Sequence, residues 1–417
     1  MTTRPLRRLV AVSVCLAVVL LPQPASSDDA GRWDRAGDRA SGPPDWRVQA
    51  PFSTNGIKWA DVPKDHWAKT AIDYVAATNT WMRDRRRAGP DGRHEFRPDA
   101  LEPRRLFARA LVRAFGAGLA SDATVTFTDL PDTHRLYRFA NIAVSQGWIE
   151  AEDGAFLPRR KVTTREVHRA LVLALGLGDV ATAAEAITLR DGTTVAAPEG
   201  SGTLLLGMRM GLRYNHDDEA LDVGPDSPLT RAEVAWSLYR GSTMPSWVHA
   251  SLAEYSAIEL PTLSETMRQV LDWGLRYVAY PYIWAGEWDQ ESPDGYCCGY
   301  QPQGGFDCSG LAWWLMKKAE GGWSNVPPRD YEGWSLPQRS SAQMSSVGGT
   351  LAWDDARPGD LMLYDGNDDG VVDHVNVYLG NGWALDSSSG GGGVTLLKVA
   401  GSWYEDHFVH ARRITKK

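Results

Sequence analysis

The spacing of hydrophobic residues changes partway along the chain. Between residues 58 and 241, apolar positions recur every three or four residues, the spacing of an amphipathic helix, as in the segment 230–238. A further helical pattern covers 266–278, whereas the segment 374–379 alternates apolar and polar residues in the manner of a strand. The pattern predicts a helical region followed by a separate domain that contains both helices and strands.

The helical region contains three similar units. In the third unit, Thr230 and Glu233 have the spacing of a capping box, which begins a helix. Each unit closes with a proline-containing turn and a helix start, at 96–105, 156–167 and 223–238, and the first two also open alike, at 59–63 and 127–131. Repeats of this length usually form arrays of small helical units, so we expect copies at 57–117, 126–178 and 200–241, the last with a degenerate start.

These motifs resemble S-layer homology (SLH) repeats, whose pattern runs aromatic-x-Asp-Val-Pro, a helix, Phe-x-Pro and Ile-Thr-Arg-Ala-Glu. The resemblance implies a three-pronged α-helical domain that binds a secondary cell-wall polymer linked to peptidoglycan. It assigns polymer binding to Arg231, which stands at the family's binding arginine, and to Trp59 in the first unit. Pro103 and Thr164 occupy the arginine position in the other two copies. Binding in only one or two grooves, an altered ligand and a helical spacer without a ligand therefore stay open.

The N-terminus has the three parts of a secretory signal peptide. Three arginines within the first eight residues precede an apolar run, 9–21, and the small residues 25–27. This run is shorter than the roughly 20 residues of a spanning helix, so we expect 1–27 to be cleaved on export; the alternative is a membrane anchor. No later segment is long enough to span. The polar segment 28–56 reads as a flexible spacer and 242–264 as a linker.

Charge and cysteine content narrow the possible functions. With 44 basic and 52 acidic residues the net charge is -8, which argues against nucleic acid as a partner because phosphate binding needs clustered Lys and Arg. Export would leave three cysteines, Cys297, Cys298 and Cys308, which cannot all pair. Their redox state stays open, and an odd cysteine in an exported protein indicates possible chemistry.

Cys308 and His374 are the candidate catalytic pair. Cys308 follows a loop at the start of a predicted helix that ends near Gly321, where the helix dipole and unpaired N–H groups favour the reactive thiolate. A buried structural cysteine is the alternative. His374 begins the predicted strand and shares a face with Asn376 and Tyr378, so it is a candidate base that takes the thiol proton.

These segments resemble the NlpC-type cysteine peptidases, which cut peptidoglycan stem peptides on a papain-like α+β fold. The matching motifs lie in the family's order at 281–286, 307–311, 358–361 and 374–382. The resemblance implies that 265–414 form such a domain, with no cofactor required. The roles that it implies are a nucleophile at Cys308, a base at His374, a polar third catalytic residue at Asp386, a tyrosine near the thiolate at Tyr282, and amine binding at Asp307 and Ser309.

Strand parity decides whether Asp386 can reach His374. A two-residue turn at Asn381-Gly382 would place Asp386 opposite Val377 and point it away from His374, whereas a three-residue loop would place it opposite Asn376. We therefore predict the three-residue loop. With the shorter turn, Asn376 would become the better candidate to orient the imidazole.

Two segments depart from the resemblance. About ten extra residues, which include Trp288, Cys297 and Cys298, precede Phe306 close to the expected substrate entrance, and we expect them to reshape specificity. The segment 365–373 has oxygen groups and a glycine at the spacing of a calcium-binding EF-hand loop, but lacks its glutamate at position twelve. Calcium binding and a solvated acidic turn both stay open, with these candidate ligands: Asp365, Asn367, Asp369 and Asp373.

The combined prediction is a secreted peptidoglycan hydrolase held on the wall of a Gram-positive-type bacterium. The helical repeats would bind the wall polymer while Cys308 attacks a stem-peptide amide, in particular the D-glutamyl bond to a diamino acid. An amidase or acyltransferase that uses the same Cys308 and His374 pair is an alternative. A wall-binding protein with a decayed site is a third, against which the presence of both residues weighs.

Overall fold

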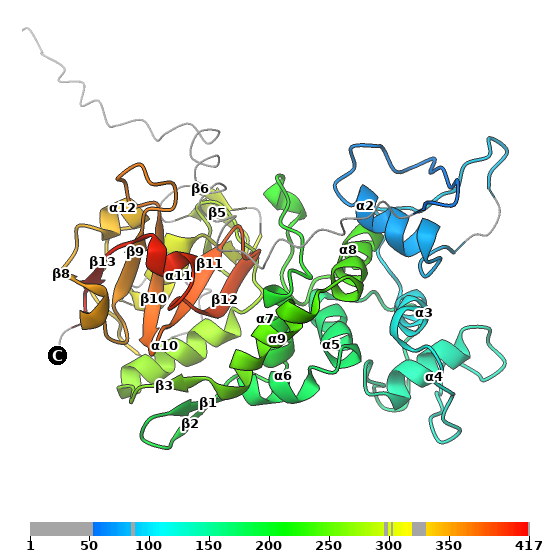
Figure 1. Cartoon of the computed structure of the whole chain (residues 1–417), viewed down its shortest axis with the longest axis horizontal. Helices are drawn as coiled ribbons and strands as arrows, with labels where there is room; N and C mark the ends of the chain where they lie inside the picture. The colour runs from blue at the N-terminus through cyan, green and yellow to red at the C-terminus, as the bar shows by residue number, and fades with distance from the viewer. Residues whose placement is uncertain (1–52, 85–87, 296–298, 302, 319–330, 416–417) are drawn as a thin grey trace, which may run out of the picture.

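The computed structural model describes residues 53–84, 88–295, 299–301, 303–318 and 331–415. The predicted signal peptide, nearly all of the predicted spacer, and Cys297 and Cys298 lie outside these ranges. A helical region and a C-terminal α+β domain lie next to each other along the long axis of the molecule (Figure 1). Within the described ranges, no helix combines the length and apolar character needed to cross a membrane.

The helical region extends from the N-terminal end of the described chain to β3. Its elements are α2 (Lys69–Ile72), η1 (Asp73–Thr78), α3 (Arg104–Phe115), α4 (Tyr137–Ser145), α5 (Thr164–Ala174), α6 (Gly178–Ala184), β1 (Ala186–Leu189), β2 (Thr194–Ala196), α7 (Ser201–Arg209), η2 (Glu219–Leu221), α8 (Arg231–Ser242), α9 (Ser246–Ser251), η3 (Leu252–Ala257) and β3 (Glu259–Leu260). The predicted capping box of Thr230 and Glu233 is confirmed at the start of α8, and Thr163 and Glu166 form an equivalent one before α5.

The three units meet where their helices begin. Glu102 N donates to Leu229 O, Leu229 N donates to Val162 O, and Val162 N donates to Glu102 O, so one residue from each unit closes a ring of backbone hydrogen bonds. The ring satisfies amide groups that would otherwise be buried without partners. The three predicted units, which are similar in sequence, are therefore also in direct contact with one another at equivalent positions.

The shared opening motif of the first two units also has a structural reason. Asp61 accepts hydrogen bonds from the backbone N–H groups of Phe96 and Arg97, at 2.9 and 2.6 Å, and Asp129 accepts from Phe156 and Leu157, both at 2.8 Å. In each unit the aspartate thus ties the opening loop to the proline-containing turn that precedes the next helix. A third unit without this aspartate must close differently.

The segment 242–264, predicted as a linker, has secondary structure of its own. It folds into α9, η3 and β3, and β3 pairs in parallel with β1. Tyr255 within it is fully buried and its hydroxyl donates to Leu396 O of the C-terminal domain at 3.1 Å. The segment therefore packs against both parts of the molecule and joins their hydrophobic cores.

The C-terminal domain is built on a six-stranded antiparallel sheet with the order β12-β11-β10-β9-β13-β8. Its elements are α10 (Glu265–Arg276), β4 (Glu287–Trp288), β5 (Ser292–Gly295), β6 (Gly299–Gln301), β7 (Gly305–Phe306), α11 (Cys308–Met316), α12 (Ser341–Met344), β8 (Gly349–Leu351), η4 (Trp353–Asp355), β9 (Leu361–Tyr364), β10 (His374–Gly380), β11 (Trp383–Ser388), β12 (Gly393–Lys398), α13 (Trp403–Asp406) and β13 (Phe408–Arg413).

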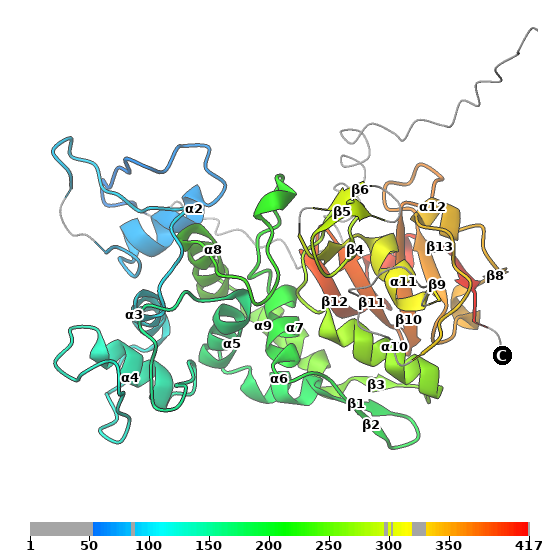
Figure 2. The same ribbon diagram turned by 180° about the vertical axis from the view of Figure 1, so that it is seen from behind.

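Both faces of this sheet are covered, so the whole of β10 is buried. Figure 2 shows α10 and α11 in front of the central strands, and α11 contacts both β10 and β11. Val375 and Val377 belong to the core on that face, whereas Tyr378 packs in a second apolar cluster on the other face with Tyr404 of α13. The predicted alternation of β10 is therefore present, but its polar face is buried rather than solvated because α13 covers it.

Candidate active site

Cys308 is the first residue of α11 and is 5% exposed. Asp307 is the N-cap, and its side chain accepts a hydrogen bond from Gly310 N in the first turn. The positive end of the helix dipole at this position favours a thiolate over a thiol. The sulfur Sγ lies 4.0 Å from Asp373 O, so the thiol is beside the residue that precedes His374.

Position 310 of the motif must be glycine because another part of the chain passes very close to it. A Cβ atom added there would lie 1.9 Å from Gly286 O and 2.7 Å from Nη2 of Arg339. The chain that contains Gly286 passes this close because Asp307 N donates to Gly286 O at 2.9 Å. Only glycine allows this approach between the nucleophile helix and the neighbouring loop.

His374 is the first residue of β10 and is held by a carboxylate. Its Nε2 lies 2.8 Å from Oδ1 of Asp386 on β11, and both side chains are buried. The other oxygen of Asp386 accepts a hydrogen bond from the hydroxyl of Tyr404 at 2.9 Å. With Nε2 donating to the carboxylate, Nδ1 is the basic nitrogen of the neutral imidazole. The contact between His374 and Asp386 that strand parity predicted is present.

The turn that produces this contact is not the one that was predicted. Gly380 pairs with Trp383, which leaves a two-residue turn, Asn381-Gly382, with both residues at positive φ. Further from the turn, Tyr378 pairs with Ala384, so the register shifts by one residue between Tyr378 and Gly380. This β-bulge adds one residue to β10 and restores the parity that a three-residue loop would give. The predicted three-residue loop is therefore wrong, although the face of Asp386 is as expected.

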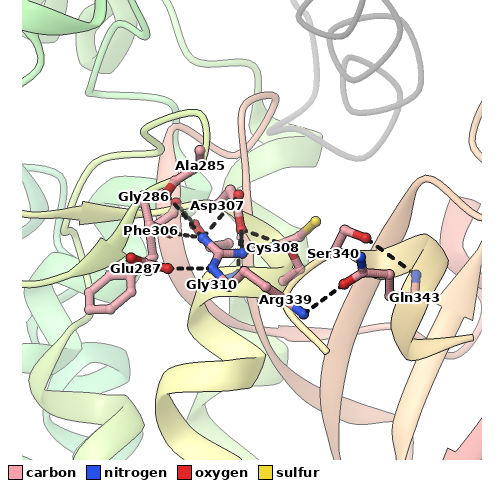
Figure 3. Close-up of polar contacts among 12 residues, drawn as sticks. Ala285, Gly286, Glu287, Phe306, Asp307, Cys308, Gly310, Arg339, Ser340 and Gln343 are labelled. Atoms are coloured by element: carbon pink, nitrogen blue, oxygen red, sulfur yellow. Dashed lines mark hydrogen bonds and ion pairs between the residues drawn. The ribbon is translucent and has the colours of Figure 1, made fainter. Parts of the chain in front are cut away.

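Arg339 is a central residue of the site that sequence reasoning missed. Its guanidinium donates to Glu287 Oε2 at 2.7 Å, to Asp307 Oδ1 at 3.1 Å and to Ser309 Oγ at 2.8 Å. It also donates to the carbonyl oxygens of Ala285 and Gly286, at 3.0 and 2.9 Å (Figure 3). Burial alone would lower the pKa of Arg339, but the carboxylates of Asp307 and Glu287 outweigh burial and raise it. Arg339 comes from a loop without hydrophobic periodicity, so no local signal marked it.

This network changes the interpretation of Asp307 and Ser309. Both side chains are buried, and their oxygens bind Arg339 and the first turn of α11. In the structure they orient the nucleophile helix. Their predicted binding of a stem-peptide amine stays a prediction. So does the predicted position of the Tyr282 hydroxyl near the thiolate; Tyr282 lies between α10 and β4 and is 3% exposed.

Arg231 is not available to a polymer, contrary to its predicted role. It is 2% exposed; its Nε donates to Phe96 O at 2.8 Å and its Nη1 pairs with Glu102 Oε2 at 2.5 Å. The guanidinium thus joins the first and third units and neutralises a buried glutamate. Trp59, the other predicted polymer-binding residue, is 8% exposed and donates from Nε1 to Asp73 Oδ1 at 2.8 Å. Arg231 therefore supports the packing of the units. Trp59, in contrast, lines an open cavity of about 500 Å³ together with Lys64 and Arg93, so its predicted binding of a polymer stays a prediction.

The predicted binding of calcium at the Asp-rich loop stays a prediction. Asp365 accepts hydrogen bonds from Asp369 N and Gly370 N, and Asp373 accepts from Gly366 N, so these carboxylates cap the turn itself. Within the described ranges, no group of three or more His, Cys, Asp or Glu residues lies close enough to hold a metal ion. Burial raises the pKa of Asp373. We assign no catalytic step to an ion at these residues or at Asn367.

A thiol at a helix start, next to a strand whose first residue is a histidine held by a carboxylate, defines the class of site found in cysteine hydrolases. The sequence profile described as NlpC/P60 family matches residues 279–413. This part of the chain is therefore an NlpC/P60 domain, with the papain-like α+β fold of that family.

Three curated relatives are each similar to about a third of the chain. The probable endopeptidase YafL of Escherichia coli (strain K12) is 29% identical over 135 residues, which are 32% of this chain and 44% of that protein. The bifunctional muramidase/DL-endopeptidase CwlT of Bacillus subtilis (strain 168) is 31% identical over 146 residues, or 35% and 36% of the two chains. The gamma-D-glutamyl-L-lysine dipeptidyl-peptidase of the same organism is 25% identical over 158 residues, or 38% and 44%. The chain thus spans less than half the length of each relative.

Proposed function

We propose that the protein is an exported cysteine peptidase that hydrolyses amide bonds in peptidoglycan stem peptides. The observation that carries the proposal is the buried contact of His374 with Asp386. His374 begins β10, and the residue before it, Asp373, lies beside the Cys308 thiol. His374 takes the proton of Cys308 through Nδ1, and the thiolate attacks the amide carbonyl. The C–N bond then breaks as the imidazolium gives its proton to the leaving amine, which leaves an acyl group on the sulfur. Backbone N–H groups at the start of α11 stabilise the oxyanion, and water then releases the acyl group.

The bond that we propose is the one between D-glutamate and the following diamino acid. The names of two relatives support it, since one is a DL-endopeptidase and the other a gamma-D-glutamyl-L-lysine dipeptidyl-peptidase. An amidase or acyltransferase would use the same Cys308 and His374 but give different products. A wall-binding protein with an inactive site would give none.

Digestion of purified muropeptides, followed by mass spectrometry, separates these functions. We expect the wild type to release fragments cut after D-glutamate, and Cys308→Ala and His374→Ala to release none. Cleavage by Cys308→Ala would refute the nucleophile, and a different product mass would refute the bond. A wild type that binds peptidoglycan without cutting it would favour the wall-binding function.

We further propose that the helical region holds the enzyme on the wall, as SLH repeats do. An open cavity of about 770 Å³ on this region is lined by more cationic than anionic side chains, a charge pattern suited to an anionic polymer: Arg105, Arg135, Arg159, Arg160, His134 and Asp129. Arg160 also pairs with Glu152 and Glu166. These residues, rather than the buried Arg231, would provide the contact.

Sedimentation of the Cys308→Ala protein with purified cell walls tests the anchor. We expect Arg135→Ala/Arg159→Ala to lower the bound fraction, and Arg138→Ala, an exposed arginine of the same unit outside the cavity lining, to leave it unchanged. Equal binding by all three proteins would refute the assignment.

A further inference from the structure

A loop of the helical region reaches the loops that flank the nucleophile. This loop, residues 214–222, connects α7 to α8 and includes η2 (Figure 1). Oε2 of Glu219 accepts a hydrogen bond from Trp284 N at 2.9 Å. The side-chain amide of Gln303 donates to the carbonyl oxygens of Glu219 and Asp222. One loop thus binds two segments of the NlpC/P60 domain, on either side of its β5–β6 insertion.

The loop is held in shape by its own buried contacts. His216 Nδ1 lies 2.8 Å from Asp222 Oδ1, and His216 N donates to Asp222 Oδ2 at 3.1 Å. Both side chains are buried. At the start of the loop, Arg213 donates to Val223 O and to Ala279 O of the NlpC/P60 domain. The loop is therefore braced at its base and presents Glu219 in a fixed position.

The residues that Glu219 contacts lead directly to the nucleophile. Trp284 precedes Ala285 and Gly286, whose carbonyl oxygens bind Arg339, and Gly286 O also accepts from Asp307 N. Ala285 has a φ of 59°, a left-handed conformation that costs free energy for a residue other than glycine. Such a corner persists only where neighbouring contacts hold it, and the bond from Glu219 is one of them.

Two exposed apolar side chains lie next to the same contact. Among the described residues six large hydrophobic side chains are exposed, and two of them, Leu221 at 50% and Trp284 at 40%, flank the contact of Glu219. A third, Val371 at 56%, lies two residues before Asp373, whose carbonyl oxygen is 4.0 Å from Cys308 Sγ. Exposed apolar side chains that gather near a reactive group are typical of a ligand-binding surface.

We infer that the 214–222 loop is a wall of the substrate site and determines how the enzyme binds the part of the substrate beyond the scissile amide. Glu219 holds the backbone at Trp284 and Ala285 in position, and the side chains of Leu221 and Trp284 contact the substrate. The helical region then contributes to substrate affinity as well as to wall attachment. The inference rests on the proposed peptidase function for the identity of the substrate.

Steady-state kinetics on a disaccharide-linked muropeptide test this wall. We expect Glu219→Ala to raise KM about ten-fold with kcat changed less than about two-fold, since one hydrogen bond to a charged acceptor is lost. Glu219→Gln keeps an acceptor oxygen and should restore most of the affinity. Asp217→Ala, which removes a carboxylate from the exposed part of the same loop, should leave KM unchanged. Trp284→Ala should raise KM as well, and adding Glu219→Ala to it should have little further effect.

Calorimetry with the Cys308→Ala protein separates this inference from the proposed reaction. We expect the Kd for the muropeptide to rise about ten-fold in Cys308→Ala/Glu219→Ala, whether or not the wild type cleaves it. Unchanged KM and Kd would refute the inference that the 214–222 loop is a wall of the substrate site. A fall in kcat at constant KM would also overturn it, because the loop would then only support the fold of the site. Equal melting temperatures of Glu219→Ala and Glu219→Gln control for unfolding.

Discussion

Tyr404→Phe removes a single hydrogen bond from the carboxylate that holds the proposed base. The Tyr404 hydroxyl donates to Asp386 Oδ2 at 2.9 Å, and Asp386 is fully buried, so no solvent can replace the lost donor. A hydrogen bond to a charged group contributes about 1.5–3 kcal/mol. If this energy holds the Asp386 carboxylate, and through it the imidazole of His374, in the reactive position, kcat falls about ten- to one-hundred-fold. We expect KM to change less than about two-fold.

Tyr364→Phe is the matched control. Tyr364 and Tyr404 are both buried, and their rings lie 5.8 and 5.7 Å from that of His374. The Tyr364 hydroxyl, however, lies 3.2 Å from Asn376 Oδ1, not against Asp386. The two substitutions therefore remove the same atom from similar surroundings. We expect Tyr364→Phe to retain kcat within about three-fold, because it removes only a neutral hydrogen bond outside the catalytic pair.

The pH dependence of kcat distinguishes an electrostatic effect from a packing effect. Loss of the Tyr404 donor leaves the Asp386 charge less compensated, which favours the imidazolium and raises the pKa of His374. The limb of the pH–rate profile that reports the imidazolium should therefore move to higher pH in Tyr404→Phe and stay in place in Tyr364→Phe. Equal losses in both variants, or full activity in Tyr404→Phe, would refute the positioning role.

Three further predictions follow from the packing of the two regions. Arg339→Met leaves the buried carboxylates of Glu287 and Asp307 uncompensated and should cost about 3–5 kcal/mol in urea unfolding; Arg339→Met/Glu287→Gln should recover part of this loss. Gly310→Ala would place Cβ 1.9 Å from Gly286 O, displace Cys308 and lower kcat about 100-fold, and wild-type activity would contradict the packing. Burial lowers the pKa of His168 to about 3, so the unfolded chain binds a proton that the folded protein excludes. The free energy of unfolding should therefore be highest above about pH 6.5 and fall by about 3 kcal/mol between there and pH 4. Thermal melts over this pH range measure the fall, and His168→Gln should make it smaller.

Local sequence signals predicted the elements that depend on local interactions. The α8 helix begins at Thr230 because its capping box satisfies backbone groups within the same turn, and α11 begins at Cys308 because Asp307 caps it. The role of Arg339 could not be predicted in this way, because its partners Glu287 and Asp307 lie 52 and 32 residues away. The same limit explains the segment 242–264, in which Tyr255 packs against Trp383 of β11 and donates a hydrogen bond to Leu396 O of β12, both more than 100 residues away.

Arg231 shows how a motif can match while its function differs. It occupies the expected position at the start of α8, but Glu102 and the carbonyl oxygens of Met82 and Phe96 take up its donors. Burying an arginine without such partners would cost several kcal/mol, so the partners and the burial belong together. The motif correctly predicts where Arg231 lies on the helix. It does not predict that Arg231 is buried, because the residues that bury it belong to the first unit, about 130 residues earlier in the chain.

The hairpin between β10 and β11 shows why the parity of Asp386 was correct although the turn was not. Turn length alone does not determine strand register, because a bulge adds a residue to one strand only. The bulge here ends at Gly380, whose φ of 94° suits glycine and where an added Cβ would lie 2.3 Å from Pro261 Cγ. Pro261 belongs to the segment that follows β3, so packing from the helical side sets the conformation of this turn. The hairpin that brings Asp386 to His374 is thus packed against a residue more than 100 positions away in the chain.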